Sequence, residues 1–317
     1  MTLESIATST LPDSINWEVL VVDNNSRDRT CQVVEDFRRR YPGRFRYLFE
    51  PRQGKSHALN TGVREAHGAI LAFMDDDVLV EPTCLLNLTS MLHCGEWGGA
   101  GGRILPARDF IPPRWMSLNG PYSLAGPLCG TFDLGEIRRE LDRPPHGANM
   151  AFRKDMFGKY GGFRIDLGPP PRKVQGEDTE FCQRLMRAGE RLRYEPSAIV
   201  RHPVLEYRLR KKYFLKWMFK HGRAVIRLRE SRPPVWGIPR NYLGIANRIG
   251  HLLPVCALRW VGAVDPKGRF WHKCWTWKIS GELVEISSQL LGATRQSQMP
   301  KINADIIQAS GSDRGEL

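Results

Sequence analysis

Three adjacent carboxylates, Asp75, Asp76 and Asp77, follow directly on the apolar run Ile70–Met74. A short apolar run between polar residues is typical of a buried strand, so the carboxylates stand at its carboxyl end, where open α/β sheets bind ligands. Neighbouring carboxylates repel one another and raise each other's pKa. Mg²⁺ is typically held by one or two carboxylates together with substrate phosphates. The cluster therefore indicates a divalent-cation site or, as the alternative, a solvated acidic turn.

Other residues capable of chemistry stand where a predicted strand ends or a predicted helix begins. Asp23 ends a β-branched run, Glu177–Asp178 opens a helical segment, and His202 follows a short extended stretch. Each also has an ordinary structural interpretation. Asp23 can be a helix cap, an acidic pair at a helix start is favoured by the helix dipole, and His202 can be a surface histidine. Only their combination with the three aspartates indicates a shared site.

The elements that position these residues alternate between strands and helices. Strands are predicted at 17–22, 44–49 and 69–74, with helices at 29–40 and 56–66 between them. Strand–helix–strand units at such short spacing indicate a mostly parallel sheet covered by helices on both faces. The predicted fold class is therefore α/β.

The chain continues less regularly after this part. The glycine-rich stretch 98–102 is predicted to be a break that precedes a short strand at 103–105. The segment 106–145 is rich in proline, glycine and aromatic residues and is predicted to be an irregular loop.

The composition limits the class of protein. The chain has 317 residues, 41% hydrophobic and 26% charged, which is typical of a globular protein. Its net charge of +13 indicates anionic partners such as nucleotides, acidic lipid surfaces or nucleic acid. Seven cysteines without a CxxC pair favour a reducing compartment and argue against a zinc site. No signal-peptide pattern and no apolar run of about 18 residues is found, so we expect a cytoplasmic protein.

The composition changes towards the C-terminus. Between Arg201 and Arg240 there are 12 lysines and arginines against two glutamates, and six of the nine tryptophans lie from Trp217 onward. Basic residues interleaved with tryptophan suit a helix in a membrane interface or a nucleic-acid face. The alternative is a helical extension that packs its aromatic side chains on the main domain. Three parts are predicted: a main domain at 1–203, a basic helical extension at 204–293 and a flexible tail at 294–317.

Six sequence segments occur in a fixed order along the main domain: VVDNNSRDRT, GKSHALNTG, FMDDDVLV, GANMAFR, GEDTEFCQRLMRAG and VRHP. In this order they resemble inverting family 2 glycosyltransferases of the GT-A fold, over about Leu3 to Pro203. The resemblance implies a Rossmann-like, mostly parallel sheet. It also implies transfer of a sugar from a nucleotide diphosphate sugar to an acceptor hydroxyl with inversion, and a Mn²⁺ or Mg²⁺ ion at the three aspartates.

The resemblance also implies roles for individual residues. Asp178 is expected to be the catalytic base that deprotonates the acceptor hydroxyl. Asp77 and His202 are expected to hold the metal ion. Nucleotide-sugar contacts are expected from Asp23, Lys55, Asp75 and Asp76. Acceptor-side contacts are expected from Asn149 and Glu177. A cation can neutralise the charge that grows on a diphosphate leaving group, and a carboxylate within hydrogen-bond reach can activate the hydroxyl.

The expected partners follow from the same resemblance and from the charge of the chain. A UDP-sugar is the expected donor, and a glycan or lipid is the expected acceptor, in the synthesis of a cell-surface polysaccharide or glycolipid. The basic, tryptophan-rich extension suits peripheral contact with an anionic membrane on its cytoplasmic face. Nucleic acid is not expected, because no recognised binding motif is found and charge alone is non-specific.

The chain departs from the family at its start. Family members begin with an additional strand, ending in a Pro-x-Tyr/Phe-Asn type of turn, before the helix that Thr2 to Thr10 is predicted to finish. Either this strand is encoded upstream of the assigned start, which we expect, or the chain is truncated. In the second case the strand at 17–22 lacks a neighbour. The alternative function is then an inactive binding or regulatory protein on the same scaffold.

Overall fold

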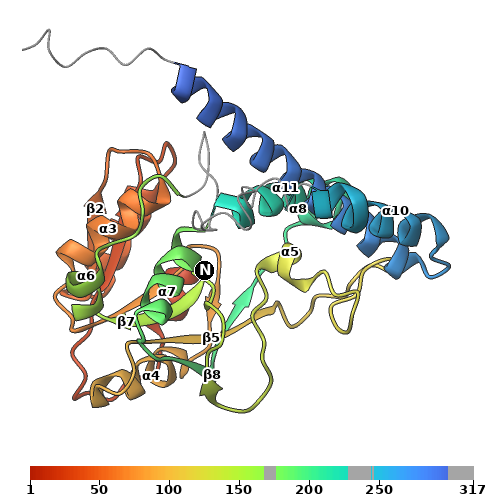
Figure 1. Ribbon diagram of the computed structural model, residues 1–317. Coiled ribbons are helices and arrows are strands. Elements are labelled where there is room, and N and C mark those ends of the chain that lie inside the picture. The colour runs from red at the N-terminus through yellow and green to blue at the C-terminus, as the bar shows by residue number, and fades with distance from the viewer. Residues whose placement is uncertain (168–175, 228–243, 245, 299–317) are drawn as a thin grey trace, which may run out of the picture.

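The structure is a computed structural model that describes residues 1–167, 176–227, 244 and 246–298. In this part of the chain the strands form two sheets among helices, and α8, α10 and α11 stand together at one side of the sheets (Figure 1). The predicted α/β fold class and the helical C-terminal region are confirmed.

A sheet of two strands carries the first part of the chain. Strands β1 (Val19–Asp23) and β2 (Phe45–Phe49) pair in parallel, and α2 (Thr30–Arg40) connects them. Helix α1 (Thr2–Ala7) precedes this unit and α3 (Lys55–Glu65) follows it. The strand–helix–strand rule therefore holds here, because a helical crossover brings the second strand back in the same direction.

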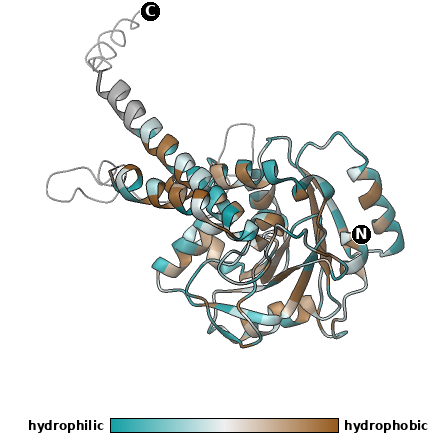
Figure 2. Cartoon of the chain, turned by 90° about the vertical axis from the view of Figure 1, so that its right-hand side faces the viewer, coloured by the Kyte–Doolittle hydropathy of each residue, from teal (hydrophilic) through white to brown (hydrophobic). Residues whose placement is uncertain are grey.

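A sheet of six strands forms the centre of the main domain. Its order is β3 (Ile70–Met74), β7 (Asn149–Arg153), β5 (Gly99–Pro106), β8 (Leu192–His202) and β4 (Leu79–Val80), and β6 (Arg139–Glu140) also pairs with β8. Apolar residues run along these interior strands (Figure 2).

The strand directions in the larger sheet correct one part of the prediction. Only β5 and β8 run parallel there, and the four other pairs, β3–β7, β5–β7, β4–β8 and β6–β8, are antiparallel. The sheet is therefore mixed and not mostly parallel. The long irregular segment between β5 and β7 allows β7 to run antiparallel to β5, since such a connection does not impose the parallel direction that a short helical crossover does.

Strands β1 and β3 are both edge strands in the described part of the chain. There β1 pairs only with β2, and β3 pairs only with β7. Val19 and Leu20 of β1 nevertheless pack against the same apolar core as Ile70 and Phe73 of β3. The two sheets are therefore joined by side-chain packing and not by a ladder of hydrogen bonds.

Short helices cover the central sheet. They are α4 (Cys84–Thr89), the 3₁₀ helix η1 (Ser90–Cys94), α6 (Asp155–Tyr160) and α7 (Glu177–Arg187). The ring of Phe181 in α7 stacks on Phe157 of α6 at 4.5 Å between centroids and meets Phe152 of β7 edge-on at 5.1 Å. This buried aromatic cluster fixes α7 on the sheet and so determines where its N-terminal carboxylates lie.

The C-terminal region packs on the main domain through aromatic side chains. Its helices are η2 (Glu206–Leu209, 3₁₀), α8 (Lys211–Arg227), η3 (Arg248–Leu252, π), α10 (Leu253–Gly262) and α11 (Pro266–Gln298). Phe214 and Phe270 share a buried cluster with Met116, and with Leu128 of α5 (Ala125–Cys129). This is the packing predicted as the alternative to an exposed face. None of the described helices is long and apolar enough to span a membrane.

The tail predicted at 294–317 overlaps the end of the last helix. Helix α11 continues to Gln298, past the boundary predicted at 294, and its C-terminal part extends away from the body of the protein (Figures 1 and 2). Residues 299–317 of the predicted tail lie outside the described residues.

Candidate functional site

The acidic cluster lies in the turn between β3 and β4, and α1 holds both sides of this turn. The Thr2 hydroxyl donates to the carbonyl oxygen of Asp76 at 2.6 Å, and the Ser5 hydroxyl accepts from the backbone N–H of Val80 at 3.0 Å. Because these bonds join the first residues of the chain to the turn, α1 fixes the direction in which the carboxylates leave the sheet.

Lys55 brings two of the predicted groups together. Its Nζ lies 2.6 Å from Oδ1 of Asp75 and 4.0 Å from Oε1 of Glu177. Burial opposes the charged form of Lys55, but the nearby carboxylates of Asp75, Glu177 and Asp178 outweigh it and raise the lysine pKa. Lys55 is therefore a fixed cation at the start of α3.

Glu177 is buried beside this lysine, and burial raises its pKa, with a further contribution from the charge of Asp178. Its Oε2 accepts from the backbone N–H of Gly176 at 3.1 Å. The Glu177 carboxylate therefore faces Lys55 and the backbone at the start of α7. This geometry favours a positioning role over the predicted contact with an acceptor.

Asp77 faces His202, the last residue of β8, and Arg208 of the 3₁₀ helix η2. Its Oδ1 lies 3.4 Å from Nε2 of His202, and its Oδ2 lies 3.5 Å from Nη2 of Arg208. Nδ1 of His202 lies 3.0 Å from the carbonyl oxygen of Pro203, so we assign the ring proton to Nδ1. The lone pair of Nε2 then points towards Asp77, an arrangement that suits a metal ligand.

These residues fit a divalent cation only in part. Within the described ranges no group of three or more His, Cys, Asp or Glu residues is arranged to hold a metal ion. Asp77 and His202 offer two ligand atoms, which is what a Mg²⁺-type ion takes when substrate phosphates complete its shell. Burial raises the pKa of Asp76, and the charges of Asp77 and Asp75 add to the effect, so the turn retains a repulsion that a cation would relieve. The donor set fits a substrate-bridged ion and not a metal held by protein alone.

Arg208 is the residue at this site that sequence reasoning missed. It belongs to η2, its side chain is mostly buried, and its Nη1 lies 3.4 Å from Nε2 of His202. The sequence signal was present, because Arg208 falls six residues after His202 in the basic stretch. That stretch contains many arginines, and nothing local distinguishes this one.

Asp178 lies at the N-terminus of α7, and both of its carboxylate oxygens accept hydrogen bonds from backbone N–H groups. Its Oδ2 accepts from the backbone N–H of Gly147 at 2.7 Å, and its Oδ1 accepts from that of Thr179 at 2.7 Å. A Cβ atom at Gly147 would lie 2.8 Å from Oδ2, so only glycine leaves room for the carboxylate there. Asp178 is therefore held in one orientation.

Asn149 does not line the acceptor side as predicted. Its side chain is fully buried, and its Nδ2 donates to the carbonyl oxygens of Arg103 at 3.0 Å and Ala198 at 2.9 Å. The amide thus links β7 to β5 and β8 inside the sheet. The correction has a simple reason: β7 is buried on both faces, so the side chain of Asn149 packs inside the protein whichever face it takes.

Asp23 ends β1 and is buried. Its Oδ1 accepts from the backbone N–H of Ser26 at 2.8 Å and its Oδ2 from the hydroxyl of Tyr47 at 2.7 Å. Burial favours the neutral form, but the hydrogen bonds from Ser26 and Tyr47 outweigh it and lower the Asp23 pKa. Asp23 caps its turn, and its contact with a nucleotide stays a prediction.

Asn24, the next residue, positions the segment that leads to Lys55. Its Nδ2 donates to the carbonyl oxygens of Glu50 at 3.1 Å and Arg52 at 2.7 Å, and its Oδ1 accepts from the Gly54 N–H at 2.7 Å. Sequence analysis treated this asparagine only as part of a turn. Its long-range role depends on residues some 30 positions away.

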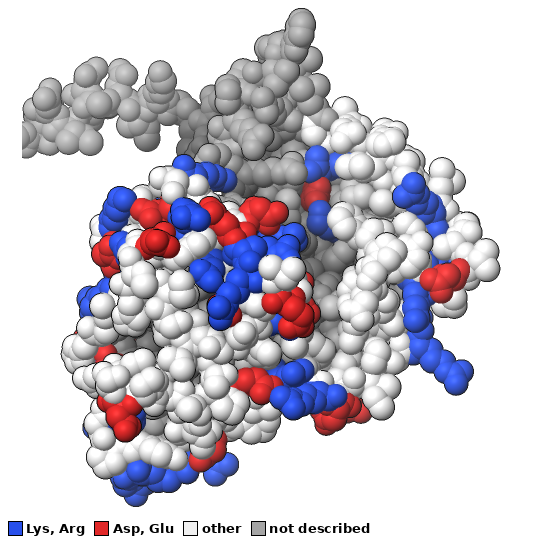
Figure 3. All heavy atoms as spheres, turned by 90° about the horizontal axis from the view of Figure 1, so that it is seen from below, with Lys and Arg blue, Asp and Glu red and all other residues white. Residues whose placement is uncertain are grey.

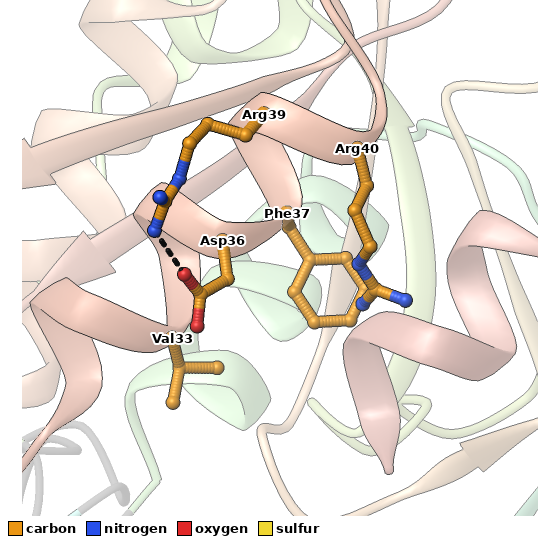
Figure 4. A pocket seen from close by; sticks show the side chains of 5 residues that line it. All are labelled: Val33, Asp36, Phe37, Arg39 and Arg40. Carbon is orange, nitrogen blue, oxygen red and sulfur yellow. Dashed lines mark hydrogen bonds and ion pairs between the residues drawn. The ribbon is translucent and has the colours of Figure 1, made fainter.

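Two cavities lie away from the acidic cluster. A surface groove of about 510 Å³ on α2 is lined by Val33, Asp36, Phe37, Arg39 and Arg40 (Figure 4). A second cavity, of about 600 Å³, lies beside the end of β5, with Arg108, Phe110 and Asp133 in its wall. Neither is lined by Lys55, Asp178 or the three aspartates, so neither is the site built above.

Comparisons with known proteins agree on one family. A protein-family model described as "Glycosyl transferase family 2" matches residues 1–161. The succinoglycan biosynthesis protein ExoM of Rhizobium meliloti is 29% identical over 245 residues, which are 75% of this chain and 74% of that protein. The glucosyl-dolichyl phosphate glucuronosyltransferase of Haloferax volcanii is 29% identical over 198 residues, 60% of each chain.

A solved structure shares the fold. The mannosyltransferase PcManGT of Pyrobaculum calidifontis, in complex with GDP-Man and Mn²⁺, aligns with a TM-score of 0.57 over 92% of this chain and 82% of that one. The sequence identity is 21%, so this likeness establishes the fold, which is the predicted GT-A fold.

Proposed function

The chain belongs to glycosyl transferase family 2, and from this premise we propose that it transfers a sugar from a nucleotide diphosphate sugar to an acceptor hydroxyl with inversion. One observation carries the proposal. Lys55, Asp75, Asp178 and the pair Asp77–His202 come from four separate elements or turns, and they supply charges of both signs at one end of the central sheet. A sugar transfer between a diphosphate donor and a hydroxyl needs these groups together.

On the donor side, we propose that Asp23, Lys55, Asp75 and Asp76 contact the nucleotide sugar. Lys55 is already paired with Asp75, which keeps the ammonium group in place before any ligand arrives. The predicted donor is a UDP-sugar. PcManGT is described with GDP-Man, so GDP is the competing nucleotide that a test must include.

We further propose that Asp77 and His202 hold Mn²⁺ or Mg²⁺ together with the diphosphate. When bound, such an ion neutralises charge on the leaving diphosphate. Arg208 pairs with Asp77 in the described structure and can donate N–H groups to a phosphate oxygen once Asp77 has another partner. The arginine and the cation therefore compete for one carboxylate.

For the chemical step, we propose that Asp178 accepts the proton of the acceptor hydroxyl. The backbone N–H groups of Gly147 and Thr179 hold its two oxygens, and the charge of Lys55 lies near. The acceptor oxygen then attacks the anomeric carbon on the face opposite the diphosphate. A single displacement of this kind inverts the configuration.

The acceptor is proposed to be a glycan or a lipid-linked sugar in cell-surface polysaccharide or glycolipid synthesis. The names of two relatives support this class, since one is a succinoglycan biosynthesis protein and the other uses a glucosyl-dolichyl phosphate. We propose a location on the cytoplasmic side, at the inner face of the cell membrane.

Calorimetry tests the donor site. UDP and GDP are titrated into the protein with and without Mn²⁺, and into Asp77→Ala and Arg208→Gln. We expect metal-dependent binding of one nucleotide that is lost in Asp77→Ala. In Arg208→Gln we expect tighter Mn²⁺ binding without nucleotide, because a competitor for Asp77 is removed, and nucleotide binding weakened about tenfold. Arg210→Gln, an exposed neighbour, is the matched control. Nucleotide binding of equal affinity with and without Mn²⁺ would contradict the proposed role of Asp77.

Turnover separates an enzyme from a binding protein on the same scaffold. With Mn²⁺ and the nucleotide sugar that binds, Asp178→Asn should keep donor affinity and lose about 10³-fold in the rate of sugar transfer or donor hydrolysis. Nucleotide binding without measurable turnover in the unchanged protein would instead favour the binding or regulatory alternative.

A further inference from the structure

Helix α10 exposes an apolar stripe. Leu258 and Val261 are 72% and 77% exposed, Val264 just beyond the helix is 91% exposed, and Ile249 in the preceding turn is 56% exposed. None of the residues of α10 is buried. Pro254, Leu258 and Val261 are spaced by four and three positions, so they form one face of the helix. A helix that turns an apolar face to solvent indicates a partner.

The charges around this stripe are positive. Arg259, Lys267 and Arg269 are exposed beside it. The acid in the same stretch, Asp265, accepts from the backbone N–H groups of Lys267 at 3.3 Å and Gly268 at 2.9 Å, and so caps the start of α11. On the face seen in Figure 3, the right-hand side is mostly uncharged, with basic and acidic groups at its margin.

Two tryptophans attach α10 to α11 at the edge of the stripe. The rings of Trp260 and Trp277 meet edge-on at 6.1 Å between centroids. The Nζ of Lys273 lies 4.9 Å from the Trp260 ring and 5.6 Å from the Trp277 ring. Apolar, aromatic and basic groups thus occur together on α10 and the start of α11, which is the combination that suits a membrane interface.

We propose that α10 and its flanking residues dock on an anionic membrane surface, with Ile249, Leu258, Val261 and Val264 in the interfacial layer and Arg259, Lys267 and Arg269 at the lipid phosphates. The proposal identifies the surface that would bind the membrane. Its biological purpose rests on the membrane location proposed above. Within the extension 204–293 it assigns the contact to α10 and not to α8, because Phe214 and Met218 of α8 are buried against the main domain.

A second copy of the chain is the main competing occupant. A two-fold symmetric contact through α10 would place the same patch of both copies face to face. The cations Arg259, Lys267 and Arg269 would then oppose their own counterparts, which costs free energy, whereas anionic headgroups complement them. Charge complementarity therefore favours the lipid surface.

Vesicle sedimentation tests the proposal with the full chain. The unchanged protein should pellet with vesicles of phosphatidylcholine mixed with phosphatidylserine, and less with phosphatidylcholine alone. Leu258→Glu with Val261→Glu should lower the partition coefficient at least about tenfold, and Lys267→Gln with Arg269→Gln should remove most of the dependence on phosphatidylserine. Ile137→Glu, an equally exposed isoleucine of the main domain, is the matched control and should bind as the unchanged protein does.

Each outcome is decisive when folding and donor binding are measured beside it. Thermal unfolding and nucleotide calorimetry should be the same in all variants, because the changed side chains are exposed and lie outside the acidic site. Equal vesicle binding by the Leu258→Glu/Val261→Glu variant, or no preference for phosphatidylserine, would overturn the proposal. A dimer in sedimentation velocity that this variant abolishes would assign the stripe to a second copy instead. A loss of nucleotide binding with unchanged vesicle binding would count against the proposed donor site and leave the membrane surface supported.

Discussion

Carboxylates with different neighbours meet at one end of the central sheet. Asp75 faces the ammonium group of Lys55, Asp77 faces His202, and Asp178 faces backbone N–H groups. Identical side chains thus acquire different chemical capacities, because an ammonium group stabilises the charged form of a carboxylate, backbone N–H groups hold it in one orientation, and the Nε2 lone pair of His202 can share a cation with Asp77. The proposed division into donor, metal and base roles rests on these neighbours.

Gly147 determines the position of the proposed base. Gly147→Ala places a Cβ atom 2.8 Å from Oδ2 of Asp178, so the carboxylate must move by part of an ångström or more. We expect the rate of sugar transfer to fall about 10²-fold, because displacement of a catalytic group on this scale removes the reactive alignment. Donor affinity in calorimetry should be unchanged. Gly158→Ala, where a Cβ meets nothing within 4 Å, is the control, and an equal loss of rate in both variants would argue against the contact.

Asp23 should make stability depend on pH in the acidic range. Its pKa in the folded protein lies below the unfolded value of about 3.9, so the unfolded state binds more protons as the pH falls. The stabilisation is therefore present above about pH 4 and is lost as the pH falls through the folded pKa.

We expect Asp23→Asn to lower the free energy of unfolding by about 1 kcal/mol at pH 7, and the difference to narrow below about pH 4. Urea unfolding at several pH values measures it. Asp142→Asn, whose side chain is 81% exposed, should show no such dependence. A difference between Asp23→Asn and the unchanged protein that stays constant down to low pH would contradict the linkage.

Helices and strands approach closely where glycines allow it. Helices α8 and α11 cross at Gly222 and Gly281, where an added Cβ would lie 2.1 Å from the carbonyl oxygens of Lys278 and Phe219. In β5, a Cβ at Gly102 would lie 2.3 Å from the carbonyl oxygen of Ala198 in β8. The glycine run predicted to be a break is therefore part of a strand, because neighbouring backbone and side chains occupy the space of its side chains.

Gly281→Ala should destabilise the crossing of α8 and α11. The overlapping atom is a backbone oxygen, so no change of rotamer relieves it, and we expect a loss of about 2 kcal/mol in the free energy of unfolding. Urea denaturation monitored by tryptophan fluorescence measures the loss. Gly262→Ala at the end of α10, where a Cβ meets nothing within 4 Å, should be close to neutral. Equal stability of the two variants would show that the helices can separate without cost.

The main domain and the C-terminal helices share a core. Trp115 meets Phe214 of α8 edge-on at 5.6 Å and Phe270 of α11 at 4.9 Å between centroids, and Met116 and Leu124 belong to the same buried cluster. The boundary predicted at residue 203 therefore separates two sequence compositions, while the apolar packing runs across it. We expect the two parts to unfold together.

Phe214→Ala tests this coupling. The side chain is fully buried, so its truncation should cost about 3–5 kcal/mol of unfolding free energy, while Val284→Ala on the exposed side of α11 should cost far less. Calorimetry should record one transition for the unchanged protein, moved to lower temperature by Phe214→Ala. Two separate transitions, with only one of them moved, would mean that the extension folds independently.

The sequence alone indicated the α/β class, the strand that ends at three aspartates, the helix that opens with Glu177–Asp178, and His202 at the end of a strand. These features are local, because apolar periodicity and the signals at strand and helix ends depend only on short segments of the sequence. The resemblance of six short segments to one family then connected them.

Packing between distant segments decided the rest. The pairing of Lys55 with Asp75, the approach of Arg208 to Asp77, the inward turn of Asn149 and the mixed direction of the central sheet all depend on residues far apart in the sequence. The exposure of the apolar stripe on α10 also depends on tertiary structure, since an apolar helical face has the same sequence pattern whether it is buried or exposed. Such contacts exist only once the chain has folded, because steric fit and burial, and not local preference, select them.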